Sequence, residues 1–184
     1  HGESMFGQME RNLAPFLSIL LSSLAVQDGA PARPEAKATK SGAGIKLDGI
    51  PNEPAWAAAP WRTNFSLAGG GGKQGGITEQ AAVQTRFKAL FDDNAVYVAV
   101  QCDEPRIEKL KARTPWRDGA VWQDDCIEIF FDPSNQGRYY HQVMVNARGT
   151  IYDSYSADFG LVHSRLWNGA FRAAGHVDRD AKKW

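Results

Sequence analysis

The chain lacks any surplus of charge and contains little cysteine. Its 184 residues hold 21 Lys and Arg against 21 Asp and Glu, so the formal net charge is zero. A protein without a basic field cannot hold a phosphate backbone electrostatically, which argues against a nucleic-acid partner. Only Cys102 and Cys126 are available for a disulfide. Both lie in strand-like runs, and the sequence fits either one bridge or two buried thiols.

Long apolar runs are also scarce, and the one at residues 13–24 is too short to be a stable membrane anchor. Ser23-Leu24-Ala25 has the small-x-small pattern of a cleavage site, which favours a signal peptide over an amphipathic N-terminal helix. Residues 1–25 are therefore predicted to be leader and signal peptide, and residues 26–43 a linker rich in Pro, Ala and Gly. Residues 44–184 form the predicted domain. This organisation predicts a secreted or periplasmic protein with no membrane span after signal cleavage.

Long helical periodicity is absent as well, and short alternating runs separated by turn residues take its place. This pattern predicts an all-β fold, an antiparallel β-sandwich of immunoglobulin or jelly-roll type. The last residues, 181–184, look like the start of a further strand, so the sandwich is predicted to be truncated, with C-terminal strands missing. The alternating runs comprise residues 82–91 and 95–102, which flank the turn Asp92-Asp93-Asn94, and residues 138–147 and 150–155, which flank Arg148-Gly149. A further run covers residues 168–177.

The segment from Trp122 to Pro133 carries the most chemistry, and its alternation predicts a strand with two unlike faces. One face carries Ile127, Ile129 and Phe131, whereas the other carries Trp122, Asp124, Cys126 and Glu128. An indole can stack on the apolar face of a sugar ring while carboxylates accept its hydroxyl hydrogens. The alternative is an ordinary surface face on which the indole covers the core.

Several pieces of the sequence recur in a known order. They are Leu47-Asp48-Gly49 before Ala55-Trp56, Phe91 to Val98, Trp122 to Pro133, Tyr139-Tyr140 with Val145 to Gly149, and Trp167. With these pieces the chain resembles the family 9 carbohydrate-binding modules and their secreted relatives over roughly residues 45–184. The resemblance implies a β-sandwich that binds an oligo- or polysaccharide without catalysis. It also implies a possible covalently linked catalytic domain such as a glycoside hydrolase, no required cofactor, and structural calcium in some members.

The resemblance also assigns sugar-binding roles to individual residues. Trp122 matches the first aromatic wall, Glu128 the carboxylate that binds hydroxyls, and Arg148 falls close to the binding arginine. Trp167 corresponds to the second aromatic wall and Asn168 to a nearby amide, although the family places that amide before the tryptophan. Two alternatives need no ligand. Glu128 and Arg148 could form a cross-strand ion pair, and Trp167 could pack in the core.

Catalysis within the domain is not expected. Asp124 and Glu128 share a face but stand about 13 Å apart along an extended strand, too far for a retaining glycosidase and for most inverting ones. Asp125 lies on the opposite face. No Ser-His-Asp order or nucleophile elbow is visible.

Metal and haem sites have weaker support. Asp92-Asp93-Asn94, Asp124-Asp125 and Asp132 are oxygen groups suited to calcium, but Asp and Asn are also common in turns. His141, His163 and His176 lack zinc spacing. A second hypothesis is a b-type haem held by Met144 and His163 in an electron-transfer domain. A third is a structural module without a small ligand, which would bury both Trp122 and Trp167.

Overall fold

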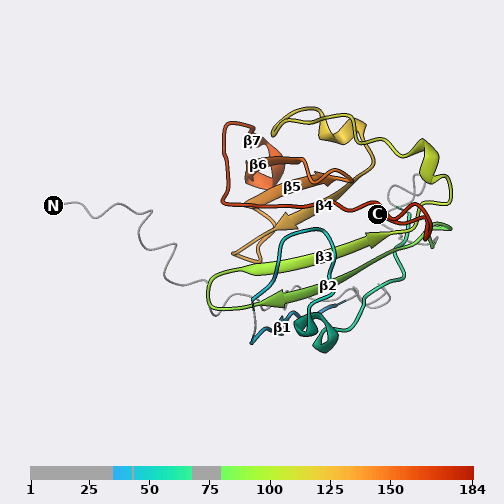
Figure 1. The fold of residues 1–184 in the computed structure, drawn as a ribbon. Coiled ribbons are helices and arrows are strands. Elements are labelled where there is room, and N and C mark those ends of the chain that lie inside the picture. The colour runs from blue at the N-terminus through green and yellow to red at the C-terminus, as the bar shows by residue number, and fades with distance from the viewer. Residues whose placement is uncertain (1–34, 43, 68–79) are drawn as a thin grey trace.

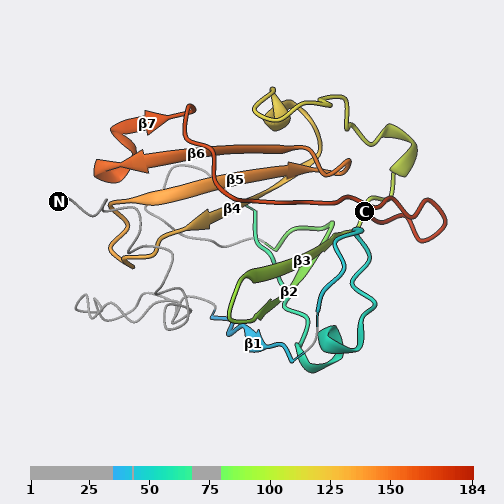
Figure 2. The ribbon, with the colours of Figure 1, turned by 60° about the vertical axis from the view of Figure 1, so that its left-hand side comes forward.

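The fold consists of two β-sheets that face each other (Figures 1 and 2). The computed structural model describes residues 35–42, 44–67 and 80–184. The predicted signal peptide, 1–25, and much of the predicted linker therefore lie outside the described residues. Four short 3-10 helices and no α-helix occur in the described part of the chain. The predicted all-β sandwich is confirmed.

The first sheet has the order β1-β2-β3, and the second has the order β4-β5-β6-β7. All neighbouring strands are antiparallel except β1 and β2, which are parallel. The strands are β1 (Thr39–Lys40), β2 (Thr85–Phe91), β3 (Val96–Cys102), β4 (Cys126–Phe131), β5 (Tyr140–Asn146), β6 (Ile151–Ala157) and β7 (Val162–Ser164). The 3-10 helices are η1 (Pro54–Ala58), η2 (Ile107–Lys109), η3 (Val121–Gln123) and η4 (Asp158–Gly160).

Both predicted hairpins form, and local turn chemistry explains them. Between β2 and β3, Asp92 Oδ1 accepts the backbone N–H groups of Asn94 at 2.7 Å and Ala95 at 2.8 Å, which closes the turn. Between β5 and β6, Gly149 has φ +88°, a left-handed conformation that glycine adopts without steric cost. These turns set the register of each hairpin and hence which side chains share a face.

A small core packs on the side of the first sheet that points away from the second. Trp56 of η1 and Ala59 pack against Leu90 and Ala99 of the sheet. Pro54 begins η1, where its fixed φ suits the first helical position. This arrangement anchors the N-terminal segment to the first sheet.

The C-terminal segment, here residues 168–177, runs between the two sheets (Figure 2). Residues 168–177 were predicted to form a strand, which is wrong: they are extended but belong to no sheet ladder. Three glycines allow the close passage. A Cβ on Gly175 would meet the carbonyl oxygen of Ala147 and lie 2.7 Å from Gly149 N, and one on Gly49 would lie 2.8 Å from the Gly175 carbonyl carbon. Backbone therefore packs directly on backbone at this crossing.

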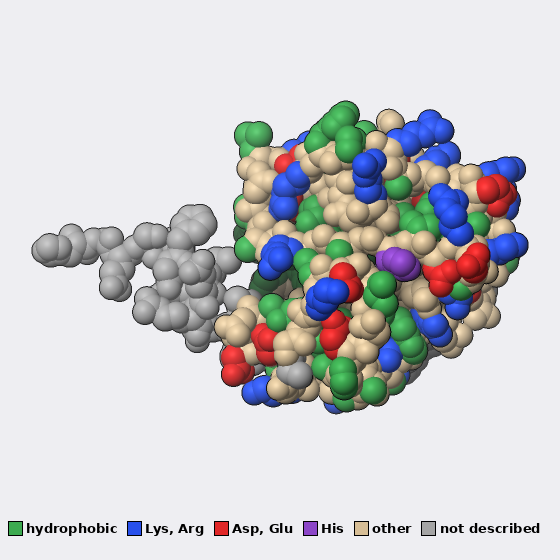
Figure 3. Space-filling view, viewed as in Figure 1, with side chains coloured by type: hydrophobic (Ala, Val, Ile, Leu, Met, Phe, Trp, Pro, Cys, Tyr) green, Lys and Arg blue, Asp and Glu red, His purple; other side chains and the backbone are tan. Residues whose placement is uncertain are grey.

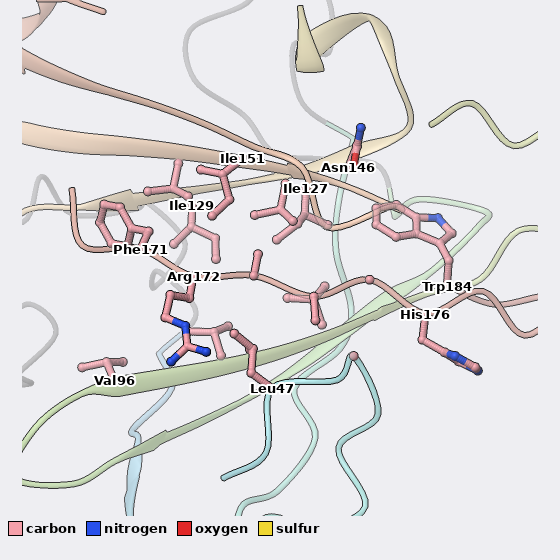
Figure 4. A pocket seen from close by; sticks show the side chains of 18 of the residues that line it. Leu47, Val96, Ile127, Ile129, Asn146, Ile151, Phe171, Arg172, His176 and Trp184 are labelled. Carbon is pink, nitrogen blue, oxygen red and sulfur yellow. The ribbon is translucent and has the colours of Figure 1, made fainter. Parts of the chain in front are cut away.

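A cavity of about 180 Å³ remains between the sheets beside this segment (Figure 4). Its walls are mostly aliphatic, with valines of β3 on one side and Ile127 and Ile129 of β4 on the other. Figure 4 shows Phe171 of the C-terminal segment directed towards the β4 isoleucines, and its ring stacks on Phe131 with centroids 5.5 Å apart. Because polar side chains are few among the lining residues, this cavity does not suit a sugar.

The last residues pair with the end of β3. Cys102 N donates to Trp184 O at 2.8 Å, and Trp184 N donates back to Cys102 O at 3.1 Å. Asp103 and Lys183 form an antiparallel bridge in the same register. The strand-like character of residues 181–184 thus corresponds to an observed pairing with the end of β3.

Both cysteines are free thiols in the structure. Cys102, at the end of β3, is buried, and burial raises its pKa to about 11. Burial also raises the pKa of Cys126. A thiol that resists ionisation is a poor nucleophile, so both side chains act as small apolar groups.

Candidate functional site

The side of the second sheet that points away from the first carries a dense set of polar and aromatic groups, here called the outer face. Cross-strand register defines it, because Glu128 lies opposite Met144, and Met144 lies opposite Tyr152. Its members are Cys126, Glu128, Phe130, Tyr140, Gln142, Met144, Asn146, Tyr152, Ser154, Ser156 and His163. The predicted separation of Glu128 from Ile127 and Ile129 is confirmed, since both isoleucines line the cavity between the sheets.

Trp122 lies beside the outer face but does not belong to any strand of the sheet. The predicted strand over Trp122 to Pro133 begins only at Cys126, and Trp122 belongs to the 3-10 helix η3. Its ring meets Tyr152 edge to face, with centroids 5.3 Å apart and planes at 81°. The indole remains 45% exposed. Trp122 and Glu128 therefore flank one surface, although the strand alternation that suggested this does not extend to Trp122.

Asp124 explains why the strand starts late. Its Oδ1 accepts the N–H of Arg113 at 3.0 Å, and its Oδ2 accepts those of Thr114 and the Asn146 side chain, both at 2.9 Å. Burial opposes the charge of Asp124, but these hydrogen bonds outweigh burial and lower its pKa to about 2. The carboxylate is thus committed to fixing the loop before β4 and does not point to the outer face as a ligand group.

The guanidinium of Arg165 lies over the indole of Trp122, 5.5 Å from the ring centroid. This is a cation–π contact between an exposed arginine and a partly exposed ring. At such exposed sites the contact is weak, on the order of 0.5–1 kcal/mol. A ligand that stacks on this ring face can therefore displace the arginine at small cost.

Hydrogen bonds link the polar groups in the middle of the outer face. The Gln142 amide donates to Glu128 Oε1, and Ser154 Oγ donates to Gln142 Oε1 at 3.0 Å. The alternative of a cross-strand ion pair between Glu128 and Arg148 is not observed, because the partner of Glu128 is Gln142. Arg148 is exposed in the β5–β6 turn, at the end of the sheet nearer Tyr152.

Trp167 and Asn168 lie on the other side of the sheet. Trp167 stacks on His141, with centroids 4.2 Å apart and planes at 26°, and His141 lies opposite Phe131 on the inner side. Asn168 Oδ1 accepts Arg117 Nε at 3.0 Å. The structure places Trp122 and Glu128 on the outer side of the second sheet but Trp167 and Asn168 on the inner side. The two indoles therefore lie on opposite sides of the second sheet.

Arg117 causes this placement. Its guanidinium forms an ion pair with Asp153 of β6 at 2.8 Å and donates to Gly169 O at 3.0 Å. Asp153 also accepts the N–H of Gly169 at 2.6 Å, and its side chain is fully buried. The segment after Trp167 is thus fastened to the inner side of β6, and Trp167 follows it.

Metal-binding geometry is not evident in the described part of the chain. No group of three or more His, Cys, Asp or Glu side chains converges there. Asp92 and Asp132 instead accept N–H groups of their own turns. Met144 and His163 share the outer face, but the His163 ring nitrogens lie 3.2 Å from Tyr152 Oη and 3.0 Å from Ser156 Oγ. A haem ligand would have to break one of these hydrogen bonds.

Sequence reasoning missed Tyr152 and Arg165, which surround the exposed indole. Tyr152 follows the β5–β6 turn, and its parity with Met144 could have been found once that hairpin was predicted. Arg165 carries no local signal, because it reaches Trp122 through the path of the chain after β7. Asn146, whose parity places it on the outer face, is buried and holds Asp124.

In the described residues, no helix has the length and apolarity that crossing a membrane requires. Basic and acidic side chains are interspersed over the face in Figure 3, in keeping with the zero net charge. No curated protein and no solved structure was found to match the chain. A family model described as carbohydrate family 9 binding domain-like matches residues 47–180. This match covers most of the chain and every strand except β1, so the chain belongs to the carbohydrate family 9 binding domain-like family.

Proposed function

We propose that this domain binds a carbohydrate on its outer face without hydrolysing it. The observation that carries the proposal is the placement of an exposed indole, Trp122, and an exposed carboxylate, Glu128, on the same side of the second sheet. Membership of the family suggests carbohydrate binding by a non-catalytic module. The polar and aromatic groups of the outer face support this surface as the location.

Each part of the site has a chemical role. The indole of Trp122 stacks on the C–H face of a pyranose ring, and Tyr152 supports it from the side. Glu128 and Gln142 offer hydroxyl partners, and the charge of Glu128 makes its hydrogen bonds the stronger ones. Arg148, exposed in the neighbouring turn, supplies a cation at the same end of the sheet as Tyr152. In this proposal Trp167 and Asn168 do not contact the sugar.

The absence of hydrolysis follows from the available carboxylates. A glycosidase needs two carboxyl groups that flank one bond. Asp124 is occupied by three hydrogen-bond donors, which leaves Glu128 without a second free carboxylate from the loop before β4. The domain therefore holds a sugar and leaves its bonds intact.

We also propose that the protein is exported and that the domain belongs to a larger protein. The apolar run at residues 13–24, followed by Ser23-Leu24-Ala25, supports export to the periplasm or the medium. There the domain would serve a larger protein of polysaccharide breakdown, with any hydrolase activity in a covalently linked domain. Calcium in a structural role would not change this function.

Calorimetric titration of the chain with glucose, cellobiose, xylobiose and a soluble β-glucan tests the proposal. We expect saturable heat with at least one of these sugars and no release of reducing ends during prolonged incubation. Folded protein that gives no heat with any of them would contradict sugar binding and favour a structural module. Release of reducing ends by the purified chain would contradict the non-catalytic part.

A further inference from the structure

The outer face carries a second exposed aromatic pair, away from Trp122. Phe130 of β4 and Tyr140 of β5 meet edge to face, with ring centroids 5.6 Å apart and planes at 70°. Phe130 lies opposite Gln142, and Tyr140 lies opposite Ser156, so both rings are on the outer face. Phe130 is 55% exposed, which makes it the more available ring of the pair.

The two aromatic groups lie at different levels and on different strands of the outer face. Tyr152 of β6, which supports Trp122, lies opposite Met144, whereas Phe130 of β4 lies opposite Gln142, two residues from Met144 on β5. Two residues of an extended strand span about 7 Å, and β4 and β6 are two strand spacings, about 10 Å, apart, so the two positions are about 12 Å apart. Gln142 lies on the strand between them, and Glu128 is two residues from Phe130 on the same face of β4. The surface thus runs from aromatic through hydrogen-bonding groups to aromatic, diagonally across the sheet.

This spacing is too long for one pyranose ring and suits several linked rings. Sugar rings present apolar C–H faces to aromatic side chains and hydroxyl groups to carboxylates and amides. A surface of alternating aromatic and polar character therefore matches a chain of sugars lying along it. By contrast, an apolar protein contact would leave the Glu128–Gln142–Ser154 hydrogen-bond chain beneath an apolar partner, at a cost in desolvation.

We propose that Phe130, held from the side by Tyr140, forms a second stacking subsite, and that the ligand is a short oligosaccharide extending from Trp122 to Phe130. This inference rests on the proposed function, because it extends the same site. It assigns the first sugar unit to Trp122 and Glu128. It assigns the far unit to Phe130, a residue that the sequence analysis placed in a strand without any binding role.

Titration with sugars of increasing length tests the second subsite. The probes are cellobiose and cellotetraose, with xylobiose and xylotetraose as a second series. We expect the tetrasaccharide of the recognised series to bind more tightly than its disaccharide. Phe130→Ala should lower tetrasaccharide affinity about ten-fold, the scale of one lost aromatic contact, and leave disaccharide affinity within about two-fold. Trp122→Ala should weaken both.

Phe65→Ala is the matched control. Phe65 is 41% exposed and forms a comparable edge-to-face pair with Phe87, but it belongs to the segment beside the first sheet. This variant should leave both affinities unchanged. Thermal midpoints of all three variants show whether each has kept its fold.

Three outcomes would overturn the inference. Equal affinity for disaccharide and tetrasaccharide would show that the site ends near Trp122. An equal loss of both affinities in Phe130→Ala would show that Phe130 acts through the fold. Absence of binding to every sugar by the parent chain would overturn the proposed function together with this extension. The first two outcomes leave the proposed function standing, so the two failures are distinguishable.

Discussion

The indole of Trp122 meets the phenol ring of Tyr152 edge to face, with centroids 5.3 Å apart, although the two residues belong to a 3-10 helix and a central strand. Tyr152 is buried, whereas Trp122 is 45% exposed. A rigid strand side chain therefore holds an exposed ring on a short, otherwise irregular segment. Such support fixes an aromatic platform at small entropic cost to a ligand.

Trp122→Ala should lower sugar affinity far more than it lowers stability. Loss of the ring removes the stacking platform, so we expect at least a ten-fold weaker interaction with any sugar that the parent chain binds. The free energy of unfolding should fall by only about 1 kcal/mol, because much of the ring is already exposed. Calorimetric titration and thermal unfolding measure the two effects on the same samples.

Trp116→Ala provides the control for Trp122→Ala. Trp116 is 66% exposed and is also an indole in the long connection between the two sheets. The Trp116→Ala variant should leave sugar affinity unchanged. A Trp122→Ala protein that loses stability while keeping full affinity would instead support the alternative that Trp122 covers the core.

Features that depend on neighbouring residues were predictable from the sequence. The hairpin at Asp92 follows from a side chain that bonds its own turn, and the hairpin at Gly149 follows from a left-handed backbone. The two faces of β4 follow from simple alternation, which placed Glu128 and Ile127 on opposite faces of the strand. Each of these depends on interactions within a few residues along the chain.

Features that depend on distant residues were not predictable. Trp167 was expected beside Trp122, but Arg117, fifty residues earlier, fastens Asn168 and Gly169 to the inner side of β6. The strand predicted at 168–177 is extended without a ladder because it passes between the sheets. Sequence alternation shows that a segment is extended, but not which neighbour it meets.

Gly175→Ala should destabilise the fold strongly. The added Cβ would meet the carbonyl oxygen of Ala147 and lie 2.7 Å from Gly149 N, and neither backbone atom can move aside easily. We expect a loss of about 3 kcal/mol in the free energy of unfolding, at the upper end of typical overpacking costs. Denaturant unfolding followed by tryptophan fluorescence measures this loss.

Gly42→Ala is the control for the glycine crossing. A Cβ at Gly42 would have no heavy atom within 4 Å, so the substitution should change stability by less than about 1 kcal/mol. Equal effects of the two substitutions would contradict a close backbone crossing at Gly175.

Arg117→Met should cost more stability than loss of an exposed ion pair. Removal of the guanidinium leaves the fully buried carboxylate of Asp153 without its cation, and it frees the segment at Gly169. We expect a loss of about 3 kcal/mol. Arg138→Ala, which breaks an exposed pair with Asp158, should cost less than about 1 kcal/mol. Similar losses in the two variants would show that the buried pair is not the anchor of the C-terminal segment.

Asp124 should make stability depend on acid pH. Burial raises its pKa, but hydrogen bonds from Arg113, Thr114 and Asn146 outweigh burial, so the folded pKa is about 2 against an ordinary value of 3.8. A lowered folded pKa gives stability that is fully present above the unfolded value and is lost as pH falls through the folded one. The contribution should therefore be complete above about pH 5 and should decline towards pH 2.

Asp124→Asn separates this contribution from general acid unfolding. The amide oxygen can still accept hydrogen bonds, so the loop before β4 keeps part of its anchorage, but the group no longer titrates. The free energy of unfolding of the parent should exceed that of the variant at pH 6, and the difference should shrink between about pH 5 and pH 2. Asp93→Asn, at an exposed carboxylate whose ion pair with Lys40 lies on the surface, is the matched control. If the difference in free energy of unfolding between parent and variant stays constant from pH 6 to pH 2, the fold does not favour the ionised form of Asp124.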